Sequence, residues 1–323
     1  MEAIPMKRLL VLLAVFSFSC VAAAQSYPTK AVRLVVPFGP GGVADITARL
    51  VAPKLAEGLG EQVIVENKPS AGGILAAQDV VRSAPDGHTL LVINNGTAVS
   101  EALFKSLPYD PAKDFATIST IGFFPLVILA DPKSPLKSVQ DVIAHAKRNP
   151  GKMNIGTIGI GSTQNLAAEI FKSAAGIDAV IIPYKNTGEV VAAAKSGDAG
   201  IIFEILAPAM SHIRSGGLRA IAVTTPKRFS GLPDIPTAME GGLGGYDVAS
   251  WNGLAAPAKT PRAVIDRLHQ EVVKAVAAPD VRERFANLGV EPRAMTPDEM
   301  RGFFAGEIKR WSRVVEDAKI PKR

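Results

Sequence analysis

Two glycine-rich segments each join a predicted strand to a predicted helix. The first is Phe38-Gly39-Pro40-Gly41-Gly42, and the second runs from Gly156 to Thr163. The first N–H groups of a helix have no acceptor within it and carry partial positive charge, so both segments suit a bound anion. Ser162 and Thr163 add hydroxyl donors to the second segment. Facing one cleft, the two loops would hold a dicarboxylate from both sides, although short loops also need glycine simply to turn.

Two acidic side chains occupy positions from which they can act on a ligand. Asp45 lies in the first turn of the helix that follows the first loop, where it serves equally well to complement the helix dipole. Glu204 ends the apolar run Ile201-Ile202-Phe203, so we expect its carboxyl group to face the cleft. For Glu204, contact with a ligand and a structural hydrogen bond both stay open.

The sequence contains no arrangement of residues that predicts catalysis or a bound cofactor. The second loop lacks the third glycine of a dinucleotide fingerprint, and neither loop has the Lys-Ser/Thr pair of a phosphate-binding loop. Ser162 is not part of a nucleophile elbow, because Gln164 stands where that motif has glycine. The histidines lack metal-ligand spacing and are predicted to lie on the surface: His88, His145, His212 and His269. We therefore expect a binding protein with no catalytic residue, cofactor or metal.

The elements that position these residues alternate along the chain. A first βαβαβ unit is predicted, with strands over 32–38, 63–66 and 88–94 and helices over 42–58 and 74–82. A second α/β series spans 139–224 and is reached through two extended runs, 118–122 and 126–130. A loop over 227–246, a strand over 248–255 and three helices complete the chain. The helices cover 261–276, 279–288 and 297–318; Thr260 and Thr296 precede proline as helix caps, and Glu299 completes a capping box.

Composition independently favours an α/β protein. The chain has 323 residues, of which 47% are hydrophobic and 20% charged, so it can form a large core and is not intrinsically disordered. Aromatic residues make up only 6%, so the core must consist of Ala, Val, Ile and Leu, as in parallel sheets covered by helices. The length favours two domains.

The positive net charge does not indicate nucleic-acid binding. Lys and Arg number 36 against 30 Asp and Glu, which gives a formal charge of +6. These basic residues are scattered and do not alternate with aromatic residues as a nucleic-acid surface would require. A small anionic ligand therefore suits the charge better than a nucleic acid.

The N-terminus has the pattern of a secretory signal peptide. Lys7 and Arg8 precede an apolar run over 9–18, and three alanines end at Ala24, the expected cleavage site. The run is shorter than a membrane-spanning helix. Translation from Met6 instead of Met1 would place the positive residues directly at the N-terminus, as is usual for a signal peptide. Cys20, the only cysteine, raises a lipoprotein alternative, but Ser17-Phe18-Ser19 fits a lipobox poorly. We expect residues 1–24 to be removed on export.

Many short stretches resemble one family, the Bug-type receptors of tripartite tricarboxylate transporters. They occur in the right order over essentially the whole exported chain, and include Arg33 to Phe38, Val65 to Pro69, Ala84 to Leu91, Leu107 to Pro111, Leu218 to Thr224, Leu232 to Thr237 and Trp251 to Leu254. The resemblance implies an α/β, two-domain periplasmic-binding-protein fold of the Venus-flytrap type, with a ligand cleft between its lobes. It also implies a monomeric periplasmic receptor that binds a small carboxylate and passes it to the membrane components of a transporter.

The order of elements predicts how the chain divides. We expect residues 25–125 plus 248–323 to form one lobe and residues 126–247 the other, because the chain crosses into the second α/β series and returns at Val248. Two alternatives stay open: a receptor that presents its ligand to a periplasmic sensor, and a periplasmic enzyme that acts on a carboxylate.

The resemblance also places the site. It implies that the first loop and the Gly-Ser loop of the second lobe bind a ligand carboxylate, partly through backbone N–H groups. The family usually has Thr or Ser at Ala44, Asp at Glu204 and Gly at Asn186, so the identity of the carboxylate stays open. We expect Ser162 and Thr163 to contribute more than Lys185. The candidate ligand-binding residues are Phe38, Gly39, Gly41, Gly42, Asp45, Gly161, Ser162, Thr163, Gln164, Tyr184 and Glu204.

Overall fold

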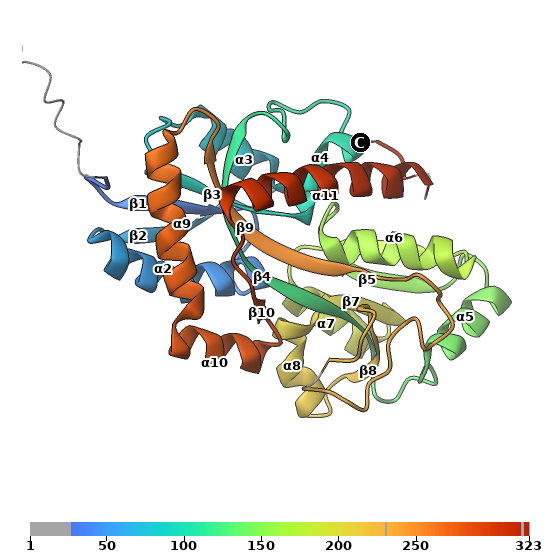
Figure 1. The fold of residues 1–323 in the computed structure, drawn as a ribbon. Helices are drawn as coiled ribbons and strands as arrows, with labels where there is room; N and C mark the ends of the chain where they lie inside the picture. Colours follow the sequence, from blue (N-terminus) through green and yellow to red (C-terminus); the bar gives the residue numbers. More distant parts are fainter. Residues whose placement is uncertain (1–26, 230, 318–319, 323) are drawn as a thin grey trace, which may run out of the picture.

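The computed structural model describes residues 27–229, 231–317 and 320–322 (Figure 1). The predicted signal peptide, its cleavage site after Ala24 and the lone Cys20 lie outside these residues. None of the helices in the described part combines the length and apolar character needed to cross a bilayer.

A parallel sheet forms from the first part of the described chain. Its order is β2-β1-β3, formed by β1 (Val32–Val36), β2 (Val63–Asn67) and β3 (Thr89–Asn94). Helix α2 (Val43–Leu59) and the short η1 (Ala71–Gly73) with helix α3 (Ile74–Arg82) connect these strands, which confirms the predicted βαβαβ unit. Strand β3 is buried along its whole length, as expected for a strand covered on both faces.

One long strand links two groups of strands. β4 (Phe115–Ala130) pairs with β9 (Ala249–Pro257) as far as Pro125, and from Leu126 onward it pairs with β7 (Ile201–Ile205) and β8 (Arg219–Val223). We call β1, β2, β3, β9 and the first part of β4 the first strand group. The sequence predicted two separate extended runs here, which is wrong, because Phe123 to Pro125 also pair with β9 and join the two runs into one strand.

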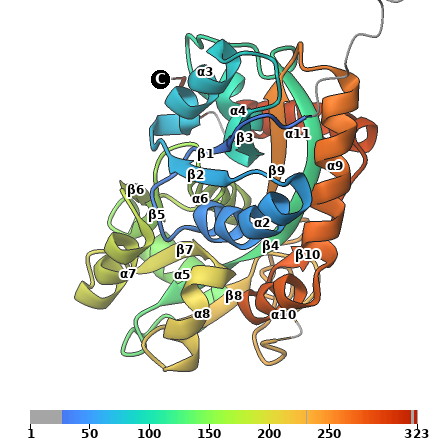
Figure 2. The ribbon, with the colours of Figure 1, turned by 90° about the vertical axis from the view of Figure 1, so that its left-hand side faces the viewer.

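The second strand group comprises the end of β4 with β7, β8, β5 (Asn154–Ile158) and β6 (Val180–Tyr184). Figures 1 and 2 show it at the lower end of the molecule, with the first strand group above. Its helices are α5 (Val139–Arg148), α6 (Thr163–Ala175), α7 (Thr187–Ser196) and α8 (Leu206–Arg214). The predicted second α/β series is therefore confirmed.

The C-terminal helices return to the first strand group. They are α9 (Arg262–Ala277), α10 (Pro279–Leu288) and α11 (Pro297–Asp317), with the short β10 (Glu291–Pro292) between the last two. Helix α9 packs on α2, and α11 packs on α4 (Asn95–Leu103), a helix that the sequence did not predict. In Figure 1, α11 runs beside α4 across the upper part of the molecule.

One of the two predicted helix caps is confirmed and one is wrong. Thr296 Oγ1 accepts a hydrogen bond from the Glu299 backbone, and the Glu299 carboxylate accepts one from the Thr296 backbone, which completes the capping box. The other cap was assigned to Thr260, but α9 starts one residue later than expected and its N-cap is Pro261. Because proline has no side-chain acceptor, that helix start has no capping hydrogen bond, and Thr260 Oγ1 is buried without a partner.

His88 also differs from its surface assignment. It is 7% exposed, and its Nε2 accepts a hydrogen bond of 3.1 Å from the Thr29 backbone. The Tyr27 ring packs edge-on against it. His88 therefore anchors the first described residues to the start of β3.

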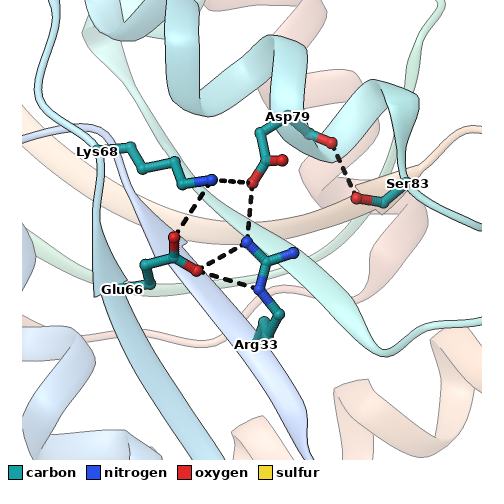
Figure 3. A network of polar contacts seen from close by, with 5 residues as sticks. All are labelled: Arg33, Glu66, Lys68, Asp79 and Ser83. Atoms are coloured by element: carbon teal, nitrogen blue, oxygen red, sulfur yellow. Dashed lines mark hydrogen bonds and ion pairs between the residues drawn. The ribbon is translucent and has the colours of Figure 1, made fainter.

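A network of charged side chains ties α3 to β1 and β2 (Figure 3). Arg33 Nη2 on β1 lies 2.7 Å from Glu66 Oε2 on β2 and 3.0 Å from Asp79 Oδ2 on α3. Lys68 Nζ bridges the same two carboxylates at 3.2 and 2.8 Å. The hydrogen bond from Arg33 holds the pKa of Glu66 below its ordinary value. These contacts fix the helix that follows η1 against the edge of the sheet.

Candidate ligand-binding site

A small cavity lies where strands of both groups end and helices begin. Its empty volume, including space open to solvent, is about 420 Å³. It is bordered by the starts of five helices: α2, α4, α6, α7 and α8. The lining residues are Phe38, Gly42, Val43, Ala44, Asn94, Ile158, Thr163, Gln164, Thr187, Glu204, Ile205, Ser250 and Asn252.

Backbone donors face this cavity without cationic side chains. The first N–H groups of α2, at Val43 and Ala44, and of α6, at Thr163 and Gln164, donate to no other described residue. Such groups have no acceptor within their helix, and the helix dipole makes them partially positive. Among the lining residues, all within the described chain, Glu204 has the only ionisable side chain. The arrangement therefore favours an anion through the main chain.

The first glycine loop is held in shape by Asp45. The Gly41 backbone donates to Asp45 Oδ2 at 3.0 Å, and Asp45 Oδ1 accepts from Arg49 at 2.9 Å and from Asn67 at 3.0 Å. Asn67 also donates to the Phe38 carbonyl at 2.9 Å. Asp45 is buried and does not line the cavity, so its carboxylate positions the loop. Gly41 has a φ of +83°, a conformation that a side chain would strain.

In the second loop, the two hydroxyl groups differ in what they bond. Ser162 is the N-cap of α6: its Oγ accepts from the Asn165 backbone at 3.1 Å and donates to the Ile158 carbonyl at 3.0 Å. Ser162 does not line the cavity, whereas Thr163 does. Thr163 Oγ1 lies 3.1 Å from Ser250 Oγ on β9, which joins α6 to the first strand group. Whether either hydroxyl contacts a ligand stays a prediction.

The loops of the two strand groups meet beside the cavity. A Cβ built on Gly96 of α4 would lie 3.2 Å from the Gly161 carbonyl, and one built on Gly161 would lie 3.5 Å from the Gly72 Cα. Main-chain atoms therefore approach closely across the space between the groups. The structure shows the cavity with its two sides in contact.

Glu204 is the last residue but one of β7, lines the cavity and is completely buried. Its Oε1 accepts hydrogen bonds of 2.7 Å from Gln164 Nε2 and from the Ile205 backbone. Its Oε2 is buried and has no hydrogen-bond partner among the described residues. Burial raises the pKa of this carboxyl above its ordinary value, and the two hydrogen bonds and the neighbouring Thr187 hydroxyl oppose the rise.

A buried polar framework supports the β9 side of the cavity. Asn95 Oδ1 accepts from the Trp251 backbone at 3.1 Å, and Asn95 Nδ2 donates to Glu307 Oε2 at 3.2 Å. The same Glu307 oxygen accepts from the indoles of Trp251 and Trp311 at 2.8 and 2.9 Å. These bonds connect α4, β9 and α11, so they fix the strand that carries Ser250.

Sequence reasoning found part of the cavity lining. Of the candidate residues, the cavity brings together Phe38, Gly42, Thr163, Gln164 and Glu204. The others do not line it: Gly39, Gly41, Asp45, Gly161 and Ser162 lie in or next to the two loops, and Tyr184 ends β6 and packs in a neighbouring apolar cluster.

Four polar lining residues were missed: Asn94, Thr187, Ser250 and Asn252. Asn94 and Thr187 lie where a strand leads into a helix, the signal already used for both glycine loops. Ser250 and Asn252 lie on β9, which reaches the cavity from the far end of the chain. Asn252 falls within the family-like stretch Trp251 to Leu254, but that stretch did not indicate a ligand-binding role.

Comparisons with known proteins match nearly the whole chain. Residues 47–320 match the model of the tripartite tricarboxylate transporter family receptor. Protein BugT of Bordetella pertussis is 35% identical over 97% of this chain and 98% of its own. The solved structure of Rpa4515 from R. palustris with adipate has a TM-score of 0.88 and 31% identity, covering 92% of this chain and all of that one. The periplasmic binding protein BugD has a TM-score of 0.86 and 31% identity, with the same coverage.

Proposed function

Because this chain belongs to the tripartite tricarboxylate transporter receptor family, we propose that it binds a small carboxylated solute in the periplasm and passes it to the membrane components of such a transporter. The family consists of solute-binding receptors rather than enzymes. The likeness to Bug proteins confirms the membership predicted from the sequence, and also the α/β periplasmic-binding-protein fold.

The observation that carries the proposal is the convergence of helix N-termini on the cavity. Five helices start at its edge, and the free N–H groups of α2 and α6 approach it from the two strand groups. A carboxylate placed between them receives preorganised donors from both sides, with no lysine or arginine to dehydrate. Rpa4515, which was solved with adipate, supports a carboxylate as the ligand.

Ligand capture requires the two sides of the cavity to separate and close. We assign the lobes to residues 25–125 plus 248–323 and to residues 126–247. The change in pairing partners of β4 between Pro125 and Leu126, and the return of the chain at β9, support this division. The chain crosses between these lobes twice, within β4 and just before β9, and two crossing segments suit a hinge.

A thermal-shift screen tests the proposal. The exported chain is tested with monocarboxylates, succinate, adipate, citrate, acidic amino acids and nicotinate. We expect one class to raise the melting temperature, since a ligand at 100 times its Kd adds about 2.7 kcal/mol to the free energy of unfolding. We expect no product by NMR after prolonged incubation. Turnover of the best ligand, or no shift with any compound, would overturn the proposal.

A matched pair of variants locates the binding. Ala44 is 2% exposed and lines the cavity, so Ala44→Leu should fill it and remove the ligand-induced shift. Ala305 is exposed on α11, so Ala305→Leu makes the same change away from the cavity. We expect the Ala305 variant to bind like the parent. A ligand-induced shift of parental size in the Ala44 variant would place the ligand elsewhere.

A further inference from the structure

Glu204 is the part of the cavity that does not fit a simple carboxylate receptor. An ionised glutamate would place a second negative charge beside the ligand, in a space where both are shielded from water. The described residues provide no cation for it: none lines the cavity, and Glu204 takes part in no ion pair. The unpartnered Oε2 is therefore the feature to be explained.

The charged groups around Glu204 are turned to other partners. On α7, Glu189 is exposed and accepts from Asn186 at 3.0 Å. On α6, Glu169 pairs with Lys172 at 3.9 Å, and His212 lies in the last turn of α8, far along the helix from Glu204. Strands β4 and β5 have no ionisable residue. The protonation of Glu204 is therefore set by burial and by its neutral neighbours Gln164, Ile205 and Thr187.

The two oxygens of Glu204 differ in their bonding, and a protonated carboxyl group accommodates this difference. Oε1 accepts two N–H donors, as a carbonyl oxygen does, and these bonds fix the orientation of the group. Oε2 forms no hydrogen bond with the described residues, although the nearby Thr187 hydroxyl acts on this carboxyl group. If it carries the proton, its O–H is free to donate into the cavity, where the helix N-termini favour an anionic acceptor.

We propose that Glu204 is a neutral hydrogen-bond donor to the ligand carboxylate, so that the receptor selects a solute presenting a carboxylate or carbonyl oxygen, rather than an ammonium group, to Glu204 Oε2. The inference rests on the proposed function, because it needs a carboxylate in this cavity. Glu204 thus supplies a directed donor without the cost of a buried cation.

Glutamine is the decisive substitution. In Glu204→Gln, the amide oxygen can accept the two existing bonds and the amide nitrogen can donate where Oε2–H did. Glu189→Gln makes the same change at an exposed site on α7. Binding of adipate, succinate and citrate is measured by calorimetry between pH 6 and pH 9 for the parent and both variants.

We expect Glu204→Gln to bind the best of these acids within about threefold of the parent at pH 6, where both present a donor. The parent's affinity should stay level or fall as pH rises, while that of Glu204→Gln stays level and Glu189→Gln follows the parent. A more than tenfold loss in Glu204→Gln at pH 6, or parental affinity that rises with pH, would overturn the inference, because an ionised Glu204 would then be the binding form. Tighter binding of an ammonium-bearing acid such as glutamate by the parent but not by Glu204→Gln would do the same.

Infrared spectroscopy on the free protein separates this inference from the proposed function. We expect the carbonyl stretch of a protonated carboxyl group in the parent at neutral pH, and its loss in Glu204→Gln. If none of the acids binds but that band is present, the proposed function fails while the protonated state of Glu204 stands. If the acids bind but the band is absent from both free and bound parent, the inference fails alone.

Discussion

The Ser162 hydroxyl, at the N-terminus of α6, is fully engaged in hydrogen bonds within the protein. Both of its hydrogen bonds are internal, to the Asn165 backbone and the Ile158 carbonyl. Ser138 offers a matched comparison, since it caps α5 with an equal distance of 3.1 Å to the Asp141 backbone and does not line the cavity. Any influence of Ser162 on a ligand is therefore expected to act through the shape of the loop.

We expect Ser162→Ala and Ser138→Ala each to lower the free energy of unfolding by roughly 1 kcal/mol, the usual cost of losing a helix cap. Ser162→Ala should also weaken carboxylate binding by about three- to tenfold, because the loop that carries the free N–H groups loosens. Urea unfolding and calorimetry measure the two effects. If both variants bind the carboxylate equally well, Ser162 acts only as a helix cap and does not contribute to binding.

Glu204 makes stability depend on pH in a defined direction. The raised pKa means that, above its ordinary value of 4.5, the folded protein keeps a proton that the unfolded chain has lost. Stability must then fall as pH rises through this window, by up to about 1.4 kcal/mol per pH unit. Glu204→Gln has no proton to lose at this position. In urea unfolding series we therefore expect its free energy of unfolding to rise relative to that of the parent from about pH 5 upward. If the free energy of unfolding of the parent rises with pH relative to that of the variant, the ionised carboxylate is stabilised in the fold.

At the scale of elements, the sequence predicted those with a clear local pattern. The apolar runs of β1 and β3 and the periodic helices α5 and α6 were found because burial imposes their spacing. Helix α4 was missed because its start, Asn95-Gly96-Thr97, reads as a turn and consists of weak helix formers. It forms because Asn94 caps it and α11, over 190 residues later, covers it. Separation in sequence from the other lining residues also hid Ser250 and Asn252.

The ion-pair network of Arg33, Glu66, Lys68 and Asp79 should contribute modestly, since its side chains are about one third exposed. We expect Glu66→Gln to lower the free energy of unfolding by about 0.5–1 kcal/mol at pH 7 and low salt. The pKa of Glu66 is lowered by Arg33, so this contribution is present at neutral pH and is lost as acid protonates the carboxylate. The difference between parent and variant should therefore shrink toward pH 3 and in 1 M salt.

Asp266→Asn provides the control for this network. Asp266 pairs with Arg262 at an exposed site on α9, and we expect its loss to cost less than Glu66→Gln. A difference between parent and Glu66→Gln that persists undiminished at pH 3 would contradict the electrostatic account.

At the scale of the whole molecule, one hydrogen bond between side chains joins the two proposed lobes. Thr163 on α6 and Ser250 on β9 lie on opposite sides of the predicted lobe boundary, and their hydroxyls are 3.1 Å apart in a buried position. If the lobes separate when the ligand leaves, this bond exists only in the closed form. Its energy then adds to ligand affinity rather than to the stability of the open protein.

We expect Thr163→Val to weaken ligand binding by about three- to tenfold, corresponding to one buried hydrogen bond of roughly 0.5–1.5 kcal/mol. Ser250→Ala should have a similar effect, and the double variant should lose less than the sum, because both changes remove the same bond. Thr225→Val, on a loop away from the cavity, is the control. If the double variant loses as much binding free energy as the two single variants together, the two hydroxyls act separately.

The free N–H groups at the starts of α2 and α6 belong to the main chain, which no point substitution other than proline removes. Mutation can reshape the wall around them, at Ala44 or Thr187 for example, without deleting the donors themselves. A gene duplicate of such a receptor can thus change which acid it prefers while it still binds acids. In this cavity the side chains of the wall can vary, whereas the main-chain donors cannot. A single substitution in the wall can therefore change which acid is bound.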